Sequence, residues 1–161
     1  MATTPDGKRD GRIALVYLGS PTCGPSNDPE LLDLLNRIRK ELPKKARAQG
    51  LAFRMVGVAI SRNVRMGLDH LRKMGPFHEV ATGARWYSLP MHYLQTVAPG
   101  IRATPQVVLL HQDGMRVHFL LRQVGVQAIR RWVAAGMPLP DRKYAQESLI
   151  SDCAGKVPWL C

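Results

Sequence analysis

IALVYLGSPTCGPS, residues 13–26, is the segment from which a fold can be predicted. Its first six residues form a nearly continuous apolar run, with the length and the β-branched and aromatic content of a strand buried on both faces. A Gly-Ser-Pro turn at residues 19–21 ends this strand, and a helical pattern begins at Pro29. Cys23 therefore stands in the connection between a buried strand and a helix.

A cysteine just ahead of a helix has unusual chemistry. The unpaired backbone N–H groups of the first helical turn point toward its sulfur, and the helix dipole favours the thiolate over the thiol. The thiolate is the form that acts as nucleophile and as leaving group. Gly24 and Pro25 make the turn and allow the helix to begin at once. We expect Cys23 to be a reactive thiolate; the alternative is an inert, buried cysteine.

The rest of the chain alternates strands with helices and then changes to a hairpin. Leucines and isoleucines recur at helical spacing after Pro29, and Pro43 is expected to kink or stop that helix. A second helix, with apolar positions Val64, Leu68 and Leu71, is expected between a cap at 61–63 and a break at 75–76. The other elements predicted are strands over 53–60, 78–81, 107–110 and 117–121 and helices over 89–97 and 128–135.

This order predicts an α/β protein with a central mixed β-sheet. Its first strands are parallel, its last pair is antiparallel, and helices cover both faces. The 161 residues, 45% of them hydrophobic, suit one domain with an ordinary core. We predict a flexible polar arm over 1–11, the folded domain over 12–137 and a C-terminal tail over 138–161.

The net charge of +11 comes from short basic clusters that are spread along the chain. Such a surface is either simply solvated or a patch for an anionic partner. The sequence has no zinc-finger spacing, no RNP-type strand and no long lysine tract, which argues against nucleic acid as the partner. It also has no apolar run of about 18 residues and no apolar signal-peptide core, so we expect no membrane span. If the sequence is complete, the expected compartment is the cytoplasm.

Several motifs resemble the thioredoxin family, in the order in which that family carries them. The loop at residues 22–26, Thr-Cys-Gly-Pro-Ser, is similar to the family's Trp-Cys-Gly-Pro-Cys. The stretch GIRATPQVVLL at 100–110 is similar to its Gly-Ile-Arg-x-x-Pro and the apolar strand that follows. Asp113-Gly114 matches the hairpin turn, and Val124-Gly125 matches the residues before the last helix. The resemblance covers residues 12–136 and is strongest to the larger tryparedoxin and nucleoredoxin branch.

The resemblance implies a thioredoxin-like fold in which Pro105 is cis and faces Cys23. Ser26 replaces the family's second cysteine, so an intraloop disulfide cannot form, and Thr22 replaces the family's tryptophan. A single-cysteine loop also resembles monothiol glutaredoxins, but their later Gly-Gly-x-Asp motif is not apparent. Peroxiredoxins need a proline and a threonine where this chain has Val16 and Ser20, so we exclude a peroxidase.

The site residues follow from the loop and from the resemblance. We expect Cys23 as nucleophile, with Ser26 as a helix-start hydrogen-bonding group whose hydroxyl can donate to the thiolate. Cys153 and Cys161 are either incidental or supply a replacement resolving thiol. The five histidines are scattered, and none is assigned to a metal. The candidate catalytic residues are thus Cys23, Ser26 and Pro105, and the candidate substrate-binding residues are Thr22, Gly24, Pro25 and Thr104.

Two functions are consistent with these residues. The first is thiol–disulfide exchange through one cysteine, on a protein or low-molecular-weight disulfide, without a cofactor and with glutathione as a candidate external thiol. The second is a redox-inactive binding module that recognises an anionic or peptide partner through the basic surface. The retained Cys-Gly-Pro turn and Pro105 favour the first. The sequence does not indicate an oligomeric state.

Overall fold

The computed structural model describes residues 11–84, 103–114, 116–140 and 146–147. Its strands form one mixed sheet in the order β3-β2-β1-β4-β5-β6. Strands β1, β2 and β3 run parallel, whereas β4 is antiparallel to β1, β5 to β4 and β6 to β5. The strands are β1 (Gly11–Gly19), β2 (Ala52–Ile60), β3 (Glu79–Gly83), β4 (Gln106–Asp113), β5 (Arg116–Val124) and β6 (Gln146–Glu147).

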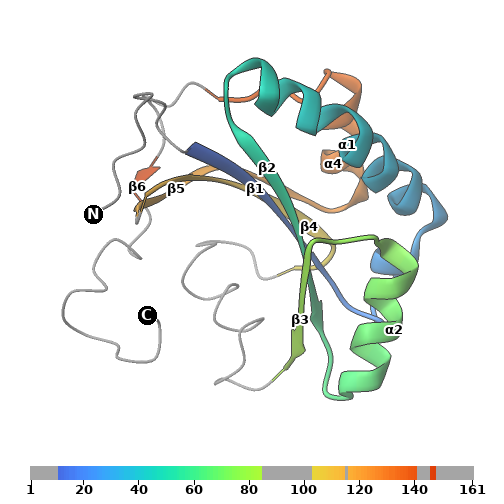
Figure 1. The fold of residues 1–161 in the computed structure, drawn as a ribbon. Coiled ribbons are helices and arrows are strands. Elements are labelled where there is room, and N and C mark those ends of the chain that lie inside the picture. The colour runs from blue at the N-terminus through green and yellow to red at the C-terminus, as the bar shows by residue number, and fades with distance from the viewer. Residues whose placement is uncertain (1–10, 85–102, 115, 141–145, 148–161) are drawn as a thin grey trace.

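Three α-helices are described, and they lie on the same side of this sheet (Figure 1). They are α1 (Pro29–Ala48), α2 (Val64–Met74) and α4 (Val126–Ala134). The chain moves from β1 to β2 to β3 in one direction across the sheet, so right-handed crossovers place α1 and α2 on one face. All three helices contribute to one buried apolar cluster, which includes Leu35, Leu71 and Ile129.

Strand β1 is the centre of the sheet and is buried on both faces, as its apolar run predicts. Leu15 and Tyr17 face the helix-side cluster, whereas Val16 and Leu18 belong to a second cluster on the opposite face. Val58 and Val108, from the two neighbouring strands, complete that second cluster. The helix predicted over 89–97 lies outside the described residues.

The α/β class, the mixed sheet and the final hairpin are confirmed, whereas the option that Pro43 stops the first helix is wrong. Pro43 does not stop α1, which continues to Ala48. Leu42 and Ala46, on either side of Pro43, are fully buried, so packing compensates for the backbone hydrogen bond that proline cannot make. Val64 is 57% exposed and does not belong to the buried face of α2.

The buried face of α2 includes a residue that an apolar pattern cannot reveal. Gly67, His70, Leu71 and Met74 point inward, and Asn63 caps the helix by accepting a hydrogen bond from the Met66 N–H at 3.2 Å. His70 lies on this buried face although the expected apolar positions of the helix, Val64, Leu68 and Leu71, do not include it. The core of the protein therefore contains a titratable ring.

Replacing Pro43 by alanine should stabilise the protein. The substitution restores a backbone donor in the interior of α1 and relieves the contact of the proline ring with the preceding turn. We expect the free energy of unfolding, measured by denaturant titration, to rise by about 1–3 kcal/mol. Lys45→Ala, an exposed site in the same helix, is the matched control and should change it by less than about 0.5 kcal/mol. Equal effects of the two substitutions would contradict the prediction.

Candidate functional site

The segment between β1 and α1 is a compact loop that holds its own shape. The Cys23 N–H donates to the Ser20 carbonyl at 3.2 Å, and the Ser26 N–H donates to the Cys23 carbonyl at 3.1 Å. The Asn27 side-chain amide donates to the carbonyls of Pro21, at 3.0 Å, and Cys23, at 2.9 Å. Asn27 therefore ties the two ends of the turn together.

Cys23 does not directly precede a long helix, which corrects one part of our expectation. It is the N-terminal flanking residue of a single 3₁₀ turn, η1 (Gly24–Asn27), and α1 begins only at Pro29, with Asp28 as its cap. The dipole of one short turn is small compared with that of a 20-residue helix. The electrostatics of Cys23 must therefore come mainly from individual hydrogen bonds.

The sheet brings Cys23 next to the segment that precedes β4. Because β1 and β4 are antiparallel, with Leu18 opposite Gln106, the end of one strand lies beside the beginning of the other. The Cys23 thiol donates to the Thr104 carbonyl at 3.2 Å, although the two residues are 81 positions apart. The Thr104–Pro105 peptide bond is cis.

The segment around Thr104 and Pro105 is fixed from both sides. The fully buried Gln106 side chain donates to the Ala103 carbonyl at 2.6 Å. The Gly125 N–H donates to the Pro105 carbonyl at 2.8 Å and joins this segment to the start of α4. The Thr104 carbonyl is thus held in place next to the sulfur of Cys23.

Opposing effects act on the pKa of Cys23. Partial burial is the largest single effect and raises the pKa, whereas hydrogen bonds with the side chain of Thr104 and with the hydroxyl and backbone N–H of Ser26 lower it. Together these hydrogen bonds outweigh burial, so the pKa lies below the usual value of 9.0. The hydrogen bond from the thiol to the Thr104 carbonyl exists only while the sulfur is protonated, so it favours the thiol and opposes the lowering of the pKa. The surroundings of Cys23 still favour the thiolate.

Ser26 occupies the position of the missing second cysteine. Its side chain is 0% exposed, and its hydroxyl makes no hydrogen bond of ordinary geometry with any described residue. A buried hydroxyl without a partner is unfavourable. The same hydroxyl lowers the pKa of Cys23, so a thiolate at that position would be its hydrogen-bond acceptor.

The other predicted site residues divide into two groups. Gly24 and Pro25 line a cleft of about 820 Å³, whose opposite wall is formed by Val126 and Arg130 of α4. Thr22 does not line this cleft, and its hydroxyl pairs with that of Ser20 at 3.1 Å. Cys153 and Cys161 lie outside the described residues.

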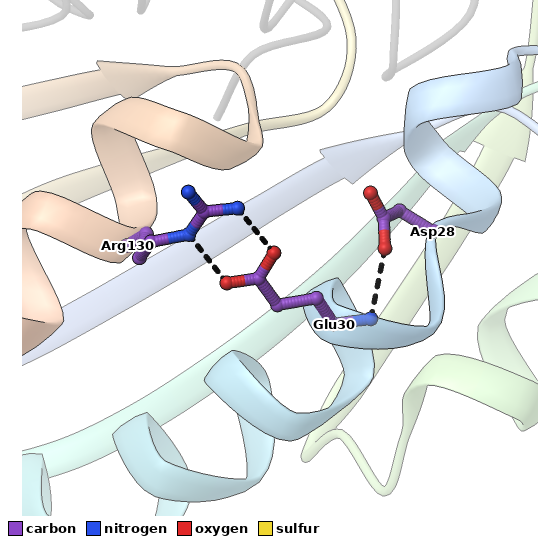
Figure 2. Close-up of polar contacts among 3 residues, drawn as sticks. All are labelled: Asp28, Glu30 and Arg130. Atoms are coloured by element: carbon purple, nitrogen blue, oxygen red, sulfur yellow. Dashed lines mark hydrogen bonds and ion pairs between the residues drawn. The ribbon is translucent and has the colours of Figure 1, made fainter.

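An ion pair that the sequence pattern did not predict joins the two helices beside this cleft (Figure 2). Arg130 of α4 donates two hydrogen bonds to the carboxylate of Glu30, in the first turn of α1. The Glu30 N–H in turn donates to the Asp28 carboxylate at 2.9 Å. Hydrogen bonding to Arg130 lowers the pKa of Glu30. The partners are 100 residues apart, so no local pattern could have indicated the pair.

A second feature missed by the sequence analysis lies in the core on the helix side of β1. The Tyr17 hydroxyl is 2.9 Å from Nε2 of His70, and both side chains are buried. Tyr17 had been assigned only to an apolar strand and His70 to no site. Tyr17 lies in a strand predicted to be buried, whereas His70 lies outside the apolar positions expected for its helix, so only the tyrosine gave a signal of a buried polar group.

Other kinds of site were also sought. Within the residues that the structure describes, no three histidine, cysteine, aspartate or glutamate side chains are grouped so that they could hold a metal ion. None of the described helices combines the length and apolarity needed to cross a bilayer.

The strand order, the cysteine loop after β1 and the cis proline before β4 define a thioredoxin-like fold. No protein-family model and no curated protein matches the sequence. Among solved structures, the chain is similar to one described as the thiol:disulfide interchange protein DsbE from Chlorobium tepidum, with 18% identity and a TM-score of 0.49 over 81% of this chain and 83% of that one. It is also similar to the thioredoxin domain of a thiol-disulfide oxidoreductase from Bacteroides vulgatus, with 13% identity and a TM-score of 0.47 over 79% and 80%.

Removing the Ser26 hydroxyl should make Cys23 less reactive. Ser26→Ala removes a donor to the thiolate, so the pKa of Cys23 rises and less thiolate is present at neutral pH. We expect alkylation by iodoacetamide at pH 7 to slow about tenfold, the scale of one hydrogen bond to a charged group. The rate is measured against pH in a Cys153→Ser/Cys161→Ser background.

Thr22→Ala is the matched control, because it removes a loop hydroxyl that pairs with Ser20 instead of the sulfur. Its pH profile should coincide with that of the unsubstituted loop. If Ser26→Ala also leaves the profile unchanged, the hydroxyl has no part in stabilising the thiolate.

Proposed function

We propose that this protein catalyses thiol–disulfide exchange through Cys23 as its single nucleophile. The observation that carries the proposal is the state of the Cys23 sulfur. It is partly exposed, its pKa is lowered, and it lies against the Thr104 carbonyl. A cysteine with only a structural role in a core is normally buried in apolar surroundings, which raise its pKa.

The first half of the reaction forms a mixed disulfide. The Cys23 thiolate attacks one sulfur of a substrate disulfide, a new S–S bond forms, and the substrate's other sulfur leaves as a thiolate that takes a proton from water. Substrate and Cys23 are then covalently joined. One S–S bond breaks and one forms while one thiolate replaces another, so this step needs no outside oxidant or reductant.

The second half needs another thiol, because Ser26 has no sulfur with which to attack. An external thiol such as glutathione, as thiolate, attacks the substrate sulfur of the mixed disulfide and releases Cys23 as thiolate. The net result is that the external thiol replaces one of the two thiols that formed the substrate disulfide. Alternatively, the thiolate of Cys153 or Cys161 attacks the Cys23 sulfur of the mixed disulfide, forms a disulfide with Cys23 and releases the substrate sulfur as a thiolate; the external thiol then reduces that disulfide.

The Thr104 carbonyl supports a role in substrate binding. In the free protein it accepts a hydrogen bond from the Cys23 thiol. Once Cys23 is a thiolate or part of a disulfide, that proton is gone and the carbonyl is free to accept a backbone N–H from an extended peptide. The cleft lined by Gly24 and Pro25 adjoins the same loop and offers room for neighbouring side chains. A peptide disulfide therefore suits this site.

The experiment compares four proteins in two reductants. With glutathione, wild type should reduce a small mixed-disulfide substrate, and Cys23→Ser should lose at least 100-fold in rate. With dithiothreitol and insulin, wild type should be slow, whereas Ser26→Cys should gain activity, because it restores a second thiol on a loop of suitable shape. Cys153→Ser/Cys161→Ser is the matched control and should retain the wild-type rate in glutathione.

Each alternative outcome has a distinct meaning. If the control variant loses activity, a tail cysteine acts as the resolving thiol. If Cys23→Ser equals wild type, or if no variant reduces either substrate, exchange through Cys23 is wrong. The chain would then be better explained as a binding module whose +11 net charge selects an anionic partner.

A further inference from the structure

A cleft of about 590 Å³ lies at the opposite end of the sheet from Cys23. Its lining includes Ala52, the first residue of β2, which pairs with Arg12 near the start of β1. Cys23 follows the other end of β1, and a strand of nine residues spans roughly 25 Å. The exchange reaction proposed above therefore does not use this cleft.

Two proline and two phenylalanine side chains form much of the wall of the cleft. Pro43 is on α1, Phe53 is on β2, and Pro76 and Phe77 stand in the segment between α2 and β3. Phe53 and Phe77 are only partly buried, although both pack against the main apolar cluster. Aromatic surface that is left open inside a concave space is surface that an apolar ligand can cover.

Arg39 supplies a fixed positive charge at this wall. Its Nε donates to the Pro76 carbonyl at 3.0 Å, its Nη2 donates to the Met74 carbonyl at 2.8 Å, and its Nη1 donates to the Asn36 side chain. All three acceptors are neutral, and no carboxylate pairs with Arg39 in the described part of the chain. Burial lowers the pKa of Arg39, so its charge is poorly solvated. The guanidinium is thus held in place without a counter-ion.

Arg47 and His78 add two further donors to the cleft, and none of the described residues that line it is an aspartate or a glutamate. Arg47 is exposed in the last turn of α1 and pairs with no carboxylate among the described residues. Nδ1 of His78 accepts a hydrogen bond from the Met55 N–H at 3.0 Å, so the proton of the neutral ring lies on Nε2. The neighbouring Glu79 is already paired with Arg54. The cleft therefore combines uncompensated positive charge with aromatic surface.

The position of Pro43 supports a binding role independently. Proline inside a helix removes a backbone hydrogen bond and is normally excluded from such a position. Arg39 and Arg47 are four residues before and four residues after it, so the three side chains follow one face of α1. Pro43 is therefore a rigid apolar wall between two guanidinium groups. Departures from local stability rules are expected at functional sites.

We propose that this cleft binds a small organic anion with an apolar, ring-bearing body. The rings of the ligand lie against Phe53 and Phe77, and its anionic group pairs with Arg39 and Arg47. Guanidinium groups suit this role, because their planar array of N–H donors matches the oxygens of an anionic group. The volume of the cleft is within the range of small-molecule sites, which is about 300–1,000 Å³.

The test uses 8-anilinonaphthalene-1-sulfonate as the anionic probe and N-phenyl-1-naphthylamine, which has the same rings and no charge, as the neutral probe. Affinities of the full chain are measured by fluorescence titration at low and at high salt. Arg47→Gln should weaken binding of the sulfonate by about threefold, the scale of one exposed ion pair, and leave the affinity for the neutral probe unchanged. High salt should likewise weaken binding of the sulfonate alone.

Arg37→Gln is the matched control, because it removes an exposed arginine of the same helix that does not line the cleft. It should leave both affinities unchanged. Ala52→Phe places a ring at an exposed position of the lining and should weaken binding of both probes. In wild type, the sulfonate should shift the NMR signals of Phe53, Phe77 and His78, a measurement that requires no variant to fold.

Binding of the probes uses no thiol, so this test is independent of the reduction assay. Cys23→Ser should bind the sulfonate as wild type does, and loss of exchange with retained binding would overturn the proposed function alone. Equal effects of Arg37→Gln and Arg47→Gln on the sulfonate would show that only net charge attracts it. Unchanged binding in Ala52→Phe, or signal shifts confined to other residues, would place the probe outside the cleft. Either result would overturn the inference, as would equal weakening of both probes by Arg47→Gln.

Discussion

The pairing of β1 with two strands of opposite direction is the constraint on which the site depends. Its parallel partner β2 requires a crossover helix, which takes the chain away from the end of β1 through the cysteine loop and α1. Its antiparallel partner β4 begins beside that same end. The thiol of Cys23 and the carbonyl of Thr104 meet because one strand ends where the other starts. Since β1 is buried on both faces, a one-residue slip in register would exchange the side chains of its two apolar clusters and disrupt the packing of both.

The part of the fold that could be predicted is the part encoded by local periodicity. The apolar run of β1, the helical spacing of α1 and the Asp113-Gly114 turn each indicate an element over a few residues, and the structure contains all three. Of the two outcomes expected at Pro43, a kink or a stop, the stop does not occur, because a local rule for proline takes no account of the buried Leu42 and Ala46, which hold the helix together. The expectation that the helix begins directly after the turn of Gly24 and Pro25 is wrong, since a short 3₁₀ turn precedes α1.

The chemistry of the site was predictable only where it lies in one stretch of sequence. Cys23 and Ser26 are three residues apart, and the roles proposed for them follow from that loop. The pairs Tyr17–His70 and Glu30–Arg130 join elements far apart in the chain, and a single sequence carries no periodic signal for such contacts. His70 was hidden further because a histidine in an amphipathic helix is normally assigned to the polar face. Its burial became visible only when α2 was placed against β1 and its cluster.

The hydrogen bonds of the Asn27 side chain hold the backbone of the cysteine loop independently of the Cys23 sulfur. Its amide is bonded to the carbonyls of Pro21 and Cys23, and neither bond involves the sulfur. Oxidation or reduction of Cys23 therefore breaks no contact that holds the backbone of the loop. In the proposed exchange reaction, the backbone of the loop therefore has the same shape before and after Cys23 changes its redox state, and the change is confined to the sulfur and to the Thr104 carbonyl that faces it. Release of a partner from the mixed disulfide would then depend on attack by a free thiol, so the concentration of free thiol in the surroundings would set the timing.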